Sequence, residues 1–125
     1  MTTNKNNDQE LEQLLPLPPA TFHILLSLAR SENHGYAIML DIEQSTNGRF
    51  TIGPGTLYTS IKRMLKAGWI EESDDRPDPQ LDDERRRYYR LTGLGRRVMQ
   101  AETERFSRTL DLARSAGVLT AVSTQ

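Results

Sequence analysis

Basic and hydroxylic side chains are concentrated in two stretches of this sequence. One stretch, from Arg85 to Thr92, reads RRRYYRLT, and the other, from Gly53 to Trp69, reads GPGTLYTSIKRMLKAGW. Arginine and lysine attract phosphate by charge, while threonine and tyrosine hydroxyls can hydrogen-bond to phosphate oxygens. The chemistry that both stretches favour is therefore the binding of a polyanion.

The net charge of −1 conceals a strong segregation of charge along the chain. Residues 48–68 hold four basic residues and no acid, residues 69–84 hold eight acids and one arginine, and residues 85–97 hold six arginines and no acid. Basic blocks in a chain of ordinary overall charge favour a polyanionic partner that is bound by one face. The alternative is a solvated basic surface without a partner.

The composition excludes several classes of protein. The sequence has no cysteine, so it forms neither a disulfide nor a thiolate metal site, and it fits a reducing, cytoplasmic compartment. The longest aliphatic run, Ile24-Leu25-Leu26, is far shorter than the roughly 20 apolar residues of a membrane span. The polar start of the chain does not resemble a signal peptide. We expect one cytoplasmic domain of 125 residues that does not enter a membrane.

The sequence contains no recognisable catalytic or metal-binding motif. His23 and His34 lack the spacing of an HExxH metal site. The acidic segment 74–84 lacks the alternating ligands of a calcium loop, and GPGT lacks the lysine of a nucleotide-binding loop. Carboxylates in a loop are also poor general acids or bases, because that role needs a fixed position. We therefore expect no enzyme activity, no metal and no cofactor.

Apolar periodicity predicts two helices in the first half of the chain. The first opens at Pro18-Pro19, and its apolar positions are Phe22, Leu25, Leu26 and Ala29. The second opens at Tyr36, and its apolar positions are Ile38, Met39 and Ile42. It should stop at Thr46-Asn47-Gly48, because asparagine and glycine tolerate the left-handed conformation at a helix end.

A third helix is predicted from Pro54, which suits a first helical turn, to Gly68, which suits a C-terminal cap. Its apolar face, expected in the core, holds Leu57, Ile61, Met64 and Leu65. Its accessible face holds Gly55, Thr59, Lys62, Arg63 and Lys66. Tyr58 lies at the border between the faces, and Thr56 lies near the helix start, where side chains point towards a partner.

Two strands are predicted after this helix, at residues 69–73 and 86–91, with a loop between them that is rich in proline and aspartate. In the second strand, Tyr89 and Leu91 would share one face, and Tyr88 and Arg90 the other. Three helices and a hairpin give a mainly α fold with a small β-hairpin, in the order of a winged helix-turn-helix. In that fold the third helix enters the major groove of DNA and the hairpin follows the phosphate backbone.

A long last helix is predicted from Gly93 to Ala116. Along it, a seam of residues recurs every four and three positions at Met99, Thr103, Phe106, Leu110 and Ala113. We expect this seam to be a homodimer contact, because a helix with ~1.5 Å rise per residue is too long here for the domain to cover. The alternative is a helix that folds back onto its own domain.

Three blocks of the sequence resemble the signature blocks of PadR-like transcriptional regulators. They are HGYAI at 34–38, GPGTLYTSIKRMLKAGWIEE at 53–72 and RRRYYRLTGLGRR at 85–97. The resemblance implies a winged-helix repressor that binds an inverted repeat in a promoter as a homodimer. It is closest to the short branch of the family, in which a single C-terminal helix replaces a longer C-terminal domain.

The expected contacts with double-stranded DNA come from three places. The third helix, which would be the recognition helix, contributes Thr56, Tyr58, Thr59, Lys62, Arg63 and Lys66. The resemblance adds His34 and Tyr36 at the start of the second helix, and Arg85, Arg86, Arg87 and Tyr88 on the wing. The wing loop is unusually acidic for this family, so we expect contacts only from the basic strand that follows it.

The expected organisation is a flexible arm at 1–16, a winged helix-turn-helix domain at 17–92, a dimerisation helix at 93–116 and a flexible tail at 117–125. A small-molecule effector could lodge between the dimer helices near Trp69 or Phe106. The rival interpretation is a winged-helix module whose basic helix face binds an acidic protein. Salt-sensitive binding to a specific duplex over scrambled DNA would separate these interpretations.

Overall fold

The computed structural model describes residues 5–73 and 87–120. Contacts divide the chain into two units, Leu17–Met99 on the one hand and Met1–Pro16 with Gln100–Gln125 on the other. Helix α5, Gly93–Ser115, begins in the first of these units and continues into the second. The boundary that the sequence suggests at residue 92 stays a prediction.

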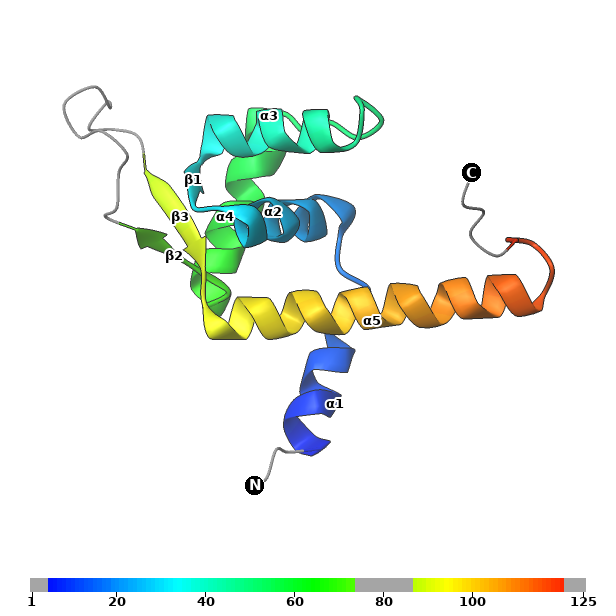
Figure 1. The fold of residues 1–125 in the computed structure, drawn as a ribbon. Helices are drawn as coiled ribbons and strands as arrows, with labels where there is room; N and C mark the ends of the chain where they lie inside the picture. The colour runs from blue at the N-terminus through cyan, green and yellow to red at the C-terminus, as the bar shows by residue number, and fades with distance from the viewer. Residues whose placement is uncertain (1–4, 74–86, 121–125) are drawn as a thin grey trace. The chain divides into compact units, whose positions relative to one another are not determined.

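The unit Leu17–Met99 contains three helices and a small sheet beside them (Figure 1). The helices are α2, Pro19–Arg30, α3, Gly35–Ser45, and α4, Pro54–Ala67. The strands are β1, Asn33–His34, β2, Ile70–Ser73, and β3, Tyr88–Leu91. The fold is therefore mainly helical with a small antiparallel sheet, as predicted.

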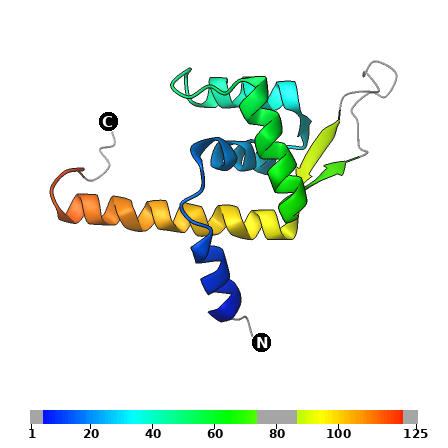
Figure 2. The ribbon, with the colours of Figure 1, turned by 180° about the vertical axis from the view of Figure 1, so that it is seen from behind.

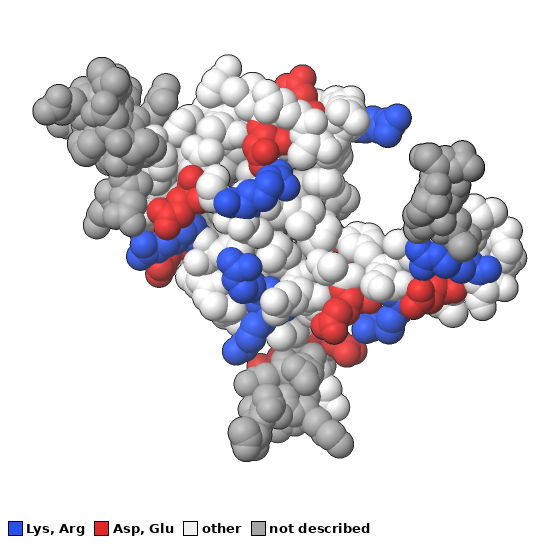
Figure 3. All heavy atoms as spheres, viewed as in Figure 1, with Lys and Arg blue, Asp and Glu red and all other residues white. Residues whose placement is uncertain are grey.

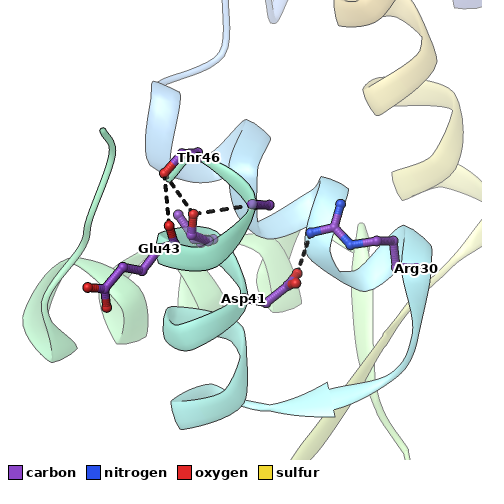
Figure 4. Close-up of polar contacts among 6 residues, drawn as sticks. Arg30, Asp41, Glu43 and Thr46 are labelled. Atoms are coloured by element: carbon purple, nitrogen blue, oxygen red, sulfur yellow. Dashed lines mark hydrogen bonds and ion pairs between the residues drawn. The ribbon is translucent and has the colours of Figure 1, made fainter. Parts of the chain in front are cut away.

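The helices begin and end at the residues that the sequence marks. Proline occupies the first turn of both α2 and α4, where its missing N–H is no loss. Gly68 ends α4 with a left-handed φ of 79°, and Asn47 follows α3 with a φ of 54°. The end of α3 is stabilised by Thr46, whose hydroxyl donates to the Ile42 carbonyl at 2.9 Å (Figure 4). The same hydroxyl accepts from the Phe50 N–H at 3.1 Å.

The sheet has one strand more than the predicted hairpin. Its order is β1-β3-β2, and both pairs are antiparallel. The register places Asn33 opposite Tyr89 and Glu71 opposite Arg90. Two residues are too few to show an alternating pattern, so nothing in the sequence distinguishes β1 from a turn before α3.

The core of this unit forms where the three helices meet the sheet. Its fully buried apolar side chains include Ile24, Leu25, Ile38, Ile42, Leu57, Ile61, Met64, Ile70 and Val98. The predicted core face of α4 is confirmed for Leu57, Ile61 and Met64, whereas Leu65 is only half-buried.

The predicted core face of α2 is wrong in part. Phe22, Leu26 and Ala29 are half-buried, while Ile24 and Leu28, which the prediction passed over, are buried. The run from Phe22 to Ala29 is apolar on almost every side, so periodicity alone leaves the orientation of the helix open.

The corner between β3 and α5 is joined to the corner between α4 and β2 by Thr92. Its hydroxyl donates to the Gly68 carbonyl at 2.6 Å and accepts from the Gly95 N–H at 3.0 Å, which caps the start of α5. A Cβ atom at Gly95 would lie 1.9 Å from the Trp69 carbonyl oxygen, so only glycine allows this approach.

The other unit contains helix α1, Lys5–Gln13, and the part of α5 from residue 100. The structure places this helix where the sequence predicts a flexible arm. Among the described residues, no helix combines the length and hydropathy that crossing a bilayer requires.

Candidate nucleic-acid interface

Helix α4 separates its side chains into a buried face and an accessible face. All six of its candidate contact residues are exposed, and they are Thr56, Tyr58, Thr59, Lys62, Arg63 and Lys66. Leu57, Ile61 and Met64 face the core. The accessible face therefore lies on a helix whose opposite face is packed in the core.

The cations of this face have no acidic partner among the described residues. Within residues 5–73 and 87–120, no carboxylate lies within 4.0 Å of Lys62, Arg63 or Lys66. Such cations retain their full attraction for phosphate, because no protein acid has to be displaced first.

The wing differs from α4 in this respect. Arg87 donates to Glu72 at 2.9 Å, and Arg90 donates to Glu71 at 2.8 Å. Acidic and basic side chains accordingly lie together beside the sheet (Figure 3). The arginine-rich strand is thus partly balanced by acids of β2, which the count of charges along the sequence could not reveal. Arg85, Arg86 and the acidic segment 74–84 lie outside the described residues.

Tyr88 does not lie on the exposed surface where we expected it. It is 7% exposed, and its ring meets the His34 ring edge-on at a centroid distance of 5.3 Å. Tyr89 is buried as well, at 5% exposure, so neither tyrosine of β3 is open to solvent. β3 is the central strand of the sheet and is in contact with α2, so its side chains lie among neighbouring elements. Burial, followed by the nearby Glu72 carboxylate, raises the pKa of Tyr89.

The start of α3 brings the remaining candidates next to α4. His34 caps the helix, because its Nδ1 accepts from the Ala37 N–H at 3.3 Å. Tyr36 is 58% exposed and is free to reach a partner. The half-buried His34 therefore has a structural role as a helix cap, while Tyr36 remains a candidate contact.

Tyr58 is held in place by the backbone of Gly35. A Cβ atom at Gly35 would lie 2.5 Å from the Tyr58 Oη atom and 3.0 Å from Leu57 Cδ2. The phenol of Tyr58 therefore lies directly on the first residue of α3. Sequence reasoning missed Gly35 as a residue of the site, and its only signal was the HGYAI block.

The histidines have packing roles in this structure. The His23 ring stacks on Phe50 with a centroid distance of 4.6 Å, and burial lowers its pKa. In the part of the chain that the structure describes, no three histidine or acidic side chains gather in the manner of metal ligands.

Most of the predicted seam on α5 is accessible. Thr103 is exposed, Phe106 and Leu110 are 43% and 46% exposed, and Ala113 is half-buried. The prediction that Met99 belongs to the dimer contact is wrong, because Met99 is 7% exposed within a single chain and belongs to the unit Leu17–Met99. The accessible seam thus begins after Met99.

Phe106 is flanked by a charged pair on its own helix. Glu102 is fully buried and accepts from Arg105 Nε at 2.6 Å, and this bond raises the pKa of Arg105. The Arg105 guanidinium lies 4.8 Å from the centroid of the Phe106 ring. The seam therefore includes the Phe106 ring, one face of which is covered by the guanidinium of Arg105.

Comparison with known proteins gives a consistent result. Residues 24–101 match the model of the "Transcriptional regulator PadR-like family". An uncharacterized protein of Lysinibacillus sphaericus is 34% identical over 73 residues, which are 58% of this chain and 64% of that protein. The chain thus spans less than two thirds of this relative.

Solved structures share the fold at low identity. A transcriptional regulator from Clostridium thermocellum superimposes with a TM-score of 0.63 and 23% identity, covering 91% of this chain and 97% of that one. A PadR family regulator from Clostridium difficile R20291 gives 0.62 and 20%, covering 78% and 97%. PadR of Bacillus subtilis, solved with operator DNA, gives 0.56 and 20%, covering 68% and 46%. With its family model matched over residues 24–101, the chain belongs to the PadR-like family of transcriptional regulators.

Proposed function

We propose that this regulator is a repressor that binds an inverted-repeat operator in duplex DNA as a homodimer. The observation that carries the proposal is the accessible face of α4, where threonines lie among cations without acidic partners in the described structure. Such a face suits a recognition helix, because hydroxyl and methyl groups can read base edges while cations bind phosphate. The operator complex of the Bacillus subtilis protein supports the assignment by family likeness.

The dimer in this proposal forms through α5. Phe106 and Leu110 expose large apolar side chains about one helical turn apart, and both lie on the predicted seam. A second copy of the same helix would bury them, as in other seams with heptad spacing. Two recognition helices related by the dimer axis would then read half-sites about one DNA turn, ~34 Å, apart.

The function is tested by selecting binding sites from random duplexes and measuring affinity for the selected site. We expect Thr59→Ala to relax discrimination at one base position of each half-site, by about 1–3 kcal/mol. Lys62→Ala should instead weaken binding to all sequences nearly equally, because a phosphate contact carries no sequence information.

A spacing series tests the dimer on DNA. Inserting ~5 base pairs between the half-sites rotates one of them by half a turn, so most of the affinity should be lost. Equal binding to the spaced and native operators would contradict a dimer on an inverted repeat. If no duplex is bound and an acidic protein is captured in a salt-sensitive manner, the chain acts as a protein-interaction module instead.

A further inference from the structure

A groove lies between α4 and the first turn of α2. Figure 2 shows the ribbon of these two helices from behind. The polar lining of the groove comes from Thr21 on α2 and from Thr56, Thr59, Ser60 and Arg63 on α4. No acidic residue is among the described residues that line it. The groove therefore offers hydroxyls and one cation, without a carboxylate that would repel an anion.

The amino-terminal turns of two helices meet at this groove. Pro18 and Gly53, the N-cap residues of α2 and α4, make no side-chain cap, and neither helix has an acid in its first turn. In the described residues, the amides of Ala20, Thr21, Gly55 and Thr56 have no backbone acceptor. Free amides and the positive end of the helix dipole attract anions at such turns.

Thr21 supplies an independent indication of a ligand. Its side chain lines the groove although the residue is only 8% exposed, and its hydroxyl has no hydrogen-bond partner within the part of the chain described. Buried hydroxyls in native proteins nearly always have a partner. A valine of similar shape would fill the same space without this polar group, so the hydroxyl is best explained by a group that arrives from outside.

We propose that this groove binds a backbone phosphate of the duplex when α4 lies in the major groove. The inference rests on the proposed function and extends the interface to the first turn of α2. Arg63 would supply the charge, and Thr21 and Ser60 would donate hydrogen bonds to the phosphate oxygens.

A second grooved surface of this unit, between α2 and α3, is a useful contrast. There Arg30 already forms an ion pair with Asp41 (Figure 4). Burial raises the pKa of Asp41, but hydrogen bonds from Ser27 and Arg30 outweigh it, so the pKa lies below its usual value. A paired arginine beside an ionised carboxylate gives no site for an anion, so of these two grooves the one beside α4 fits phosphate better.

The hydroxyl is tested with Thr21→Val and Thr21→Ser, by fluorescence anisotropy on a labelled duplex. Thr21→Val should lower the affinity for the duplex about three- to tenfold, as expected for one lost hydrogen bond. Thr21→Ser, which keeps the hydroxyl, should bind the duplex as tightly as the wild type. Thr21→Val should melt no lower than the wild type, because no partner is left unpaired in the free protein. A lower melting temperature with unchanged affinity would show a purely structural hydroxyl and overturn the proposal.

The charge is tested with Arg63→Gln, with Arg49→Gln as the matched control. Both arginines are exposed, but Arg49 lies in the loop after α3 and does not line the groove. Arg63→Gln should reduce the slope of log affinity against log salt by roughly 0.9, the value for one phosphate contact. Arg49→Gln should leave the slope unchanged, and equal slopes for wild type and Arg63→Gln would remove Arg63 from the phosphate.

The outcomes separate this inference from the function on which it rests. If the wild type binds no duplex, the proposed function fails. If the wild type binds with a steep salt dependence while Thr21→Val and Arg63→Gln bind equally well, only the groove assignment fails. The groove could instead bind free phosphate ions, and calorimetric titration of the protein with inorganic phosphate measures that binding. If Thr21→Val weakens phosphate-ion binding but not DNA binding, the groove holds a free anion and the DNA assignment is overturned.

Discussion

The contact between Gly35 and Tyr58 should make Gly35→Ala destabilising, although alanine is otherwise more favourable than glycine in a helix. The added Cβ atom would lie 2.5 Å from Tyr58 Oη, 2.9 Å from Tyr58 Cζ and 3.0 Å from Leu57 Cδ2. Leu57 is fully buried, so it has little room to retreat. Tyr58 is 51% exposed and would have to move, which displaces a candidate DNA contact.

The magnitude follows from two opposing effects. Overpacking of this kind destabilises a domain by about 1–3 kcal/mol. Replacing glycine by alanine in a helix returns ~0.4–1 kcal/mol, because the unfolded chain loses freedom. We expect a net loss of about 1 kcal/mol in the free energy of unfolding, and a melting temperature lower by ~4–8 °C for a domain of this size.

Gly93→Ala is the matched control. Gly93 is the first residue of α5 as Gly35 is the first residue of α3, and a Cβ atom at Gly93 would meet nothing within 4 Å. This variant should be as stable as the wild type or slightly more stable. Melting curves of all proteins should be recorded at one concentration, since a dimer melts in a concentration-dependent manner.

A double-mutant cycle with Tyr58→Ala assigns the loss to this contact. Tyr58→Ala removes the two closest atoms, so Gly35→Ala should cost much less in that background, with a coupling of at least ~0.5 kcal/mol. Gly35→Ala should also weaken duplex binding, whereas Gly93→Ala should not. The reasoning is refuted if Gly35→Ala is as stable as Gly93→Ala, or if the cycle shows no coupling.

Three further predictions concern other parts of the molecule. Replacing both Phe106 and Leu110 by Asp should give a monomer, and a dimer at micromolar concentration in sedimentation would contradict the seam. Glu72→Gln should free Arg87 for phosphate, tighten duplex binding about two- to fivefold and steepen its salt dependence; unchanged anisotropy titrations would count against this. The lowered pKa of His23 means that the unfolded chain binds its proton more readily, so stability should be full above about pH 6.5 and fall below it. His23→Leu should reduce this fall in denaturant unfolding at pH 7.5 and pH 5, and an identical fall in both proteins would exclude His23 as its source.

The sequence predicted the elements whose signals are local. Proline at the start of α4 and glycine at its end mark both helix boundaries. The amphipathic pattern of α4 correctly separates Leu57 from Thr59, because a helix converts spacing along the chain directly into faces. The winged helix-turn-helix order followed from these local signals, whereas the family came from the resemblance of three sequence blocks to PadR-like regulators.

The tertiary structure alone decided which residues far apart in the chain lie together. Two-residue β1 pairs with β3 only because the fold brings them side by side, and this pairing encloses Tyr88. The antiparallel register of β2 and β3 places Glu71 opposite Arg90, and the two side chains form an ion pair. The positive charge of Arg90, which has no acidic neighbour along the sequence, is therefore balanced in the folded chain. The close approach of Tyr58 to Gly35 and the hydroxyl of Thr21 in the groove beside α4 arise in the same way. The periodicity of a sequence indicates the faces of each helix or strand, but it does not indicate which segments pack against one another. These contacts are therefore visible only in the tertiary structure.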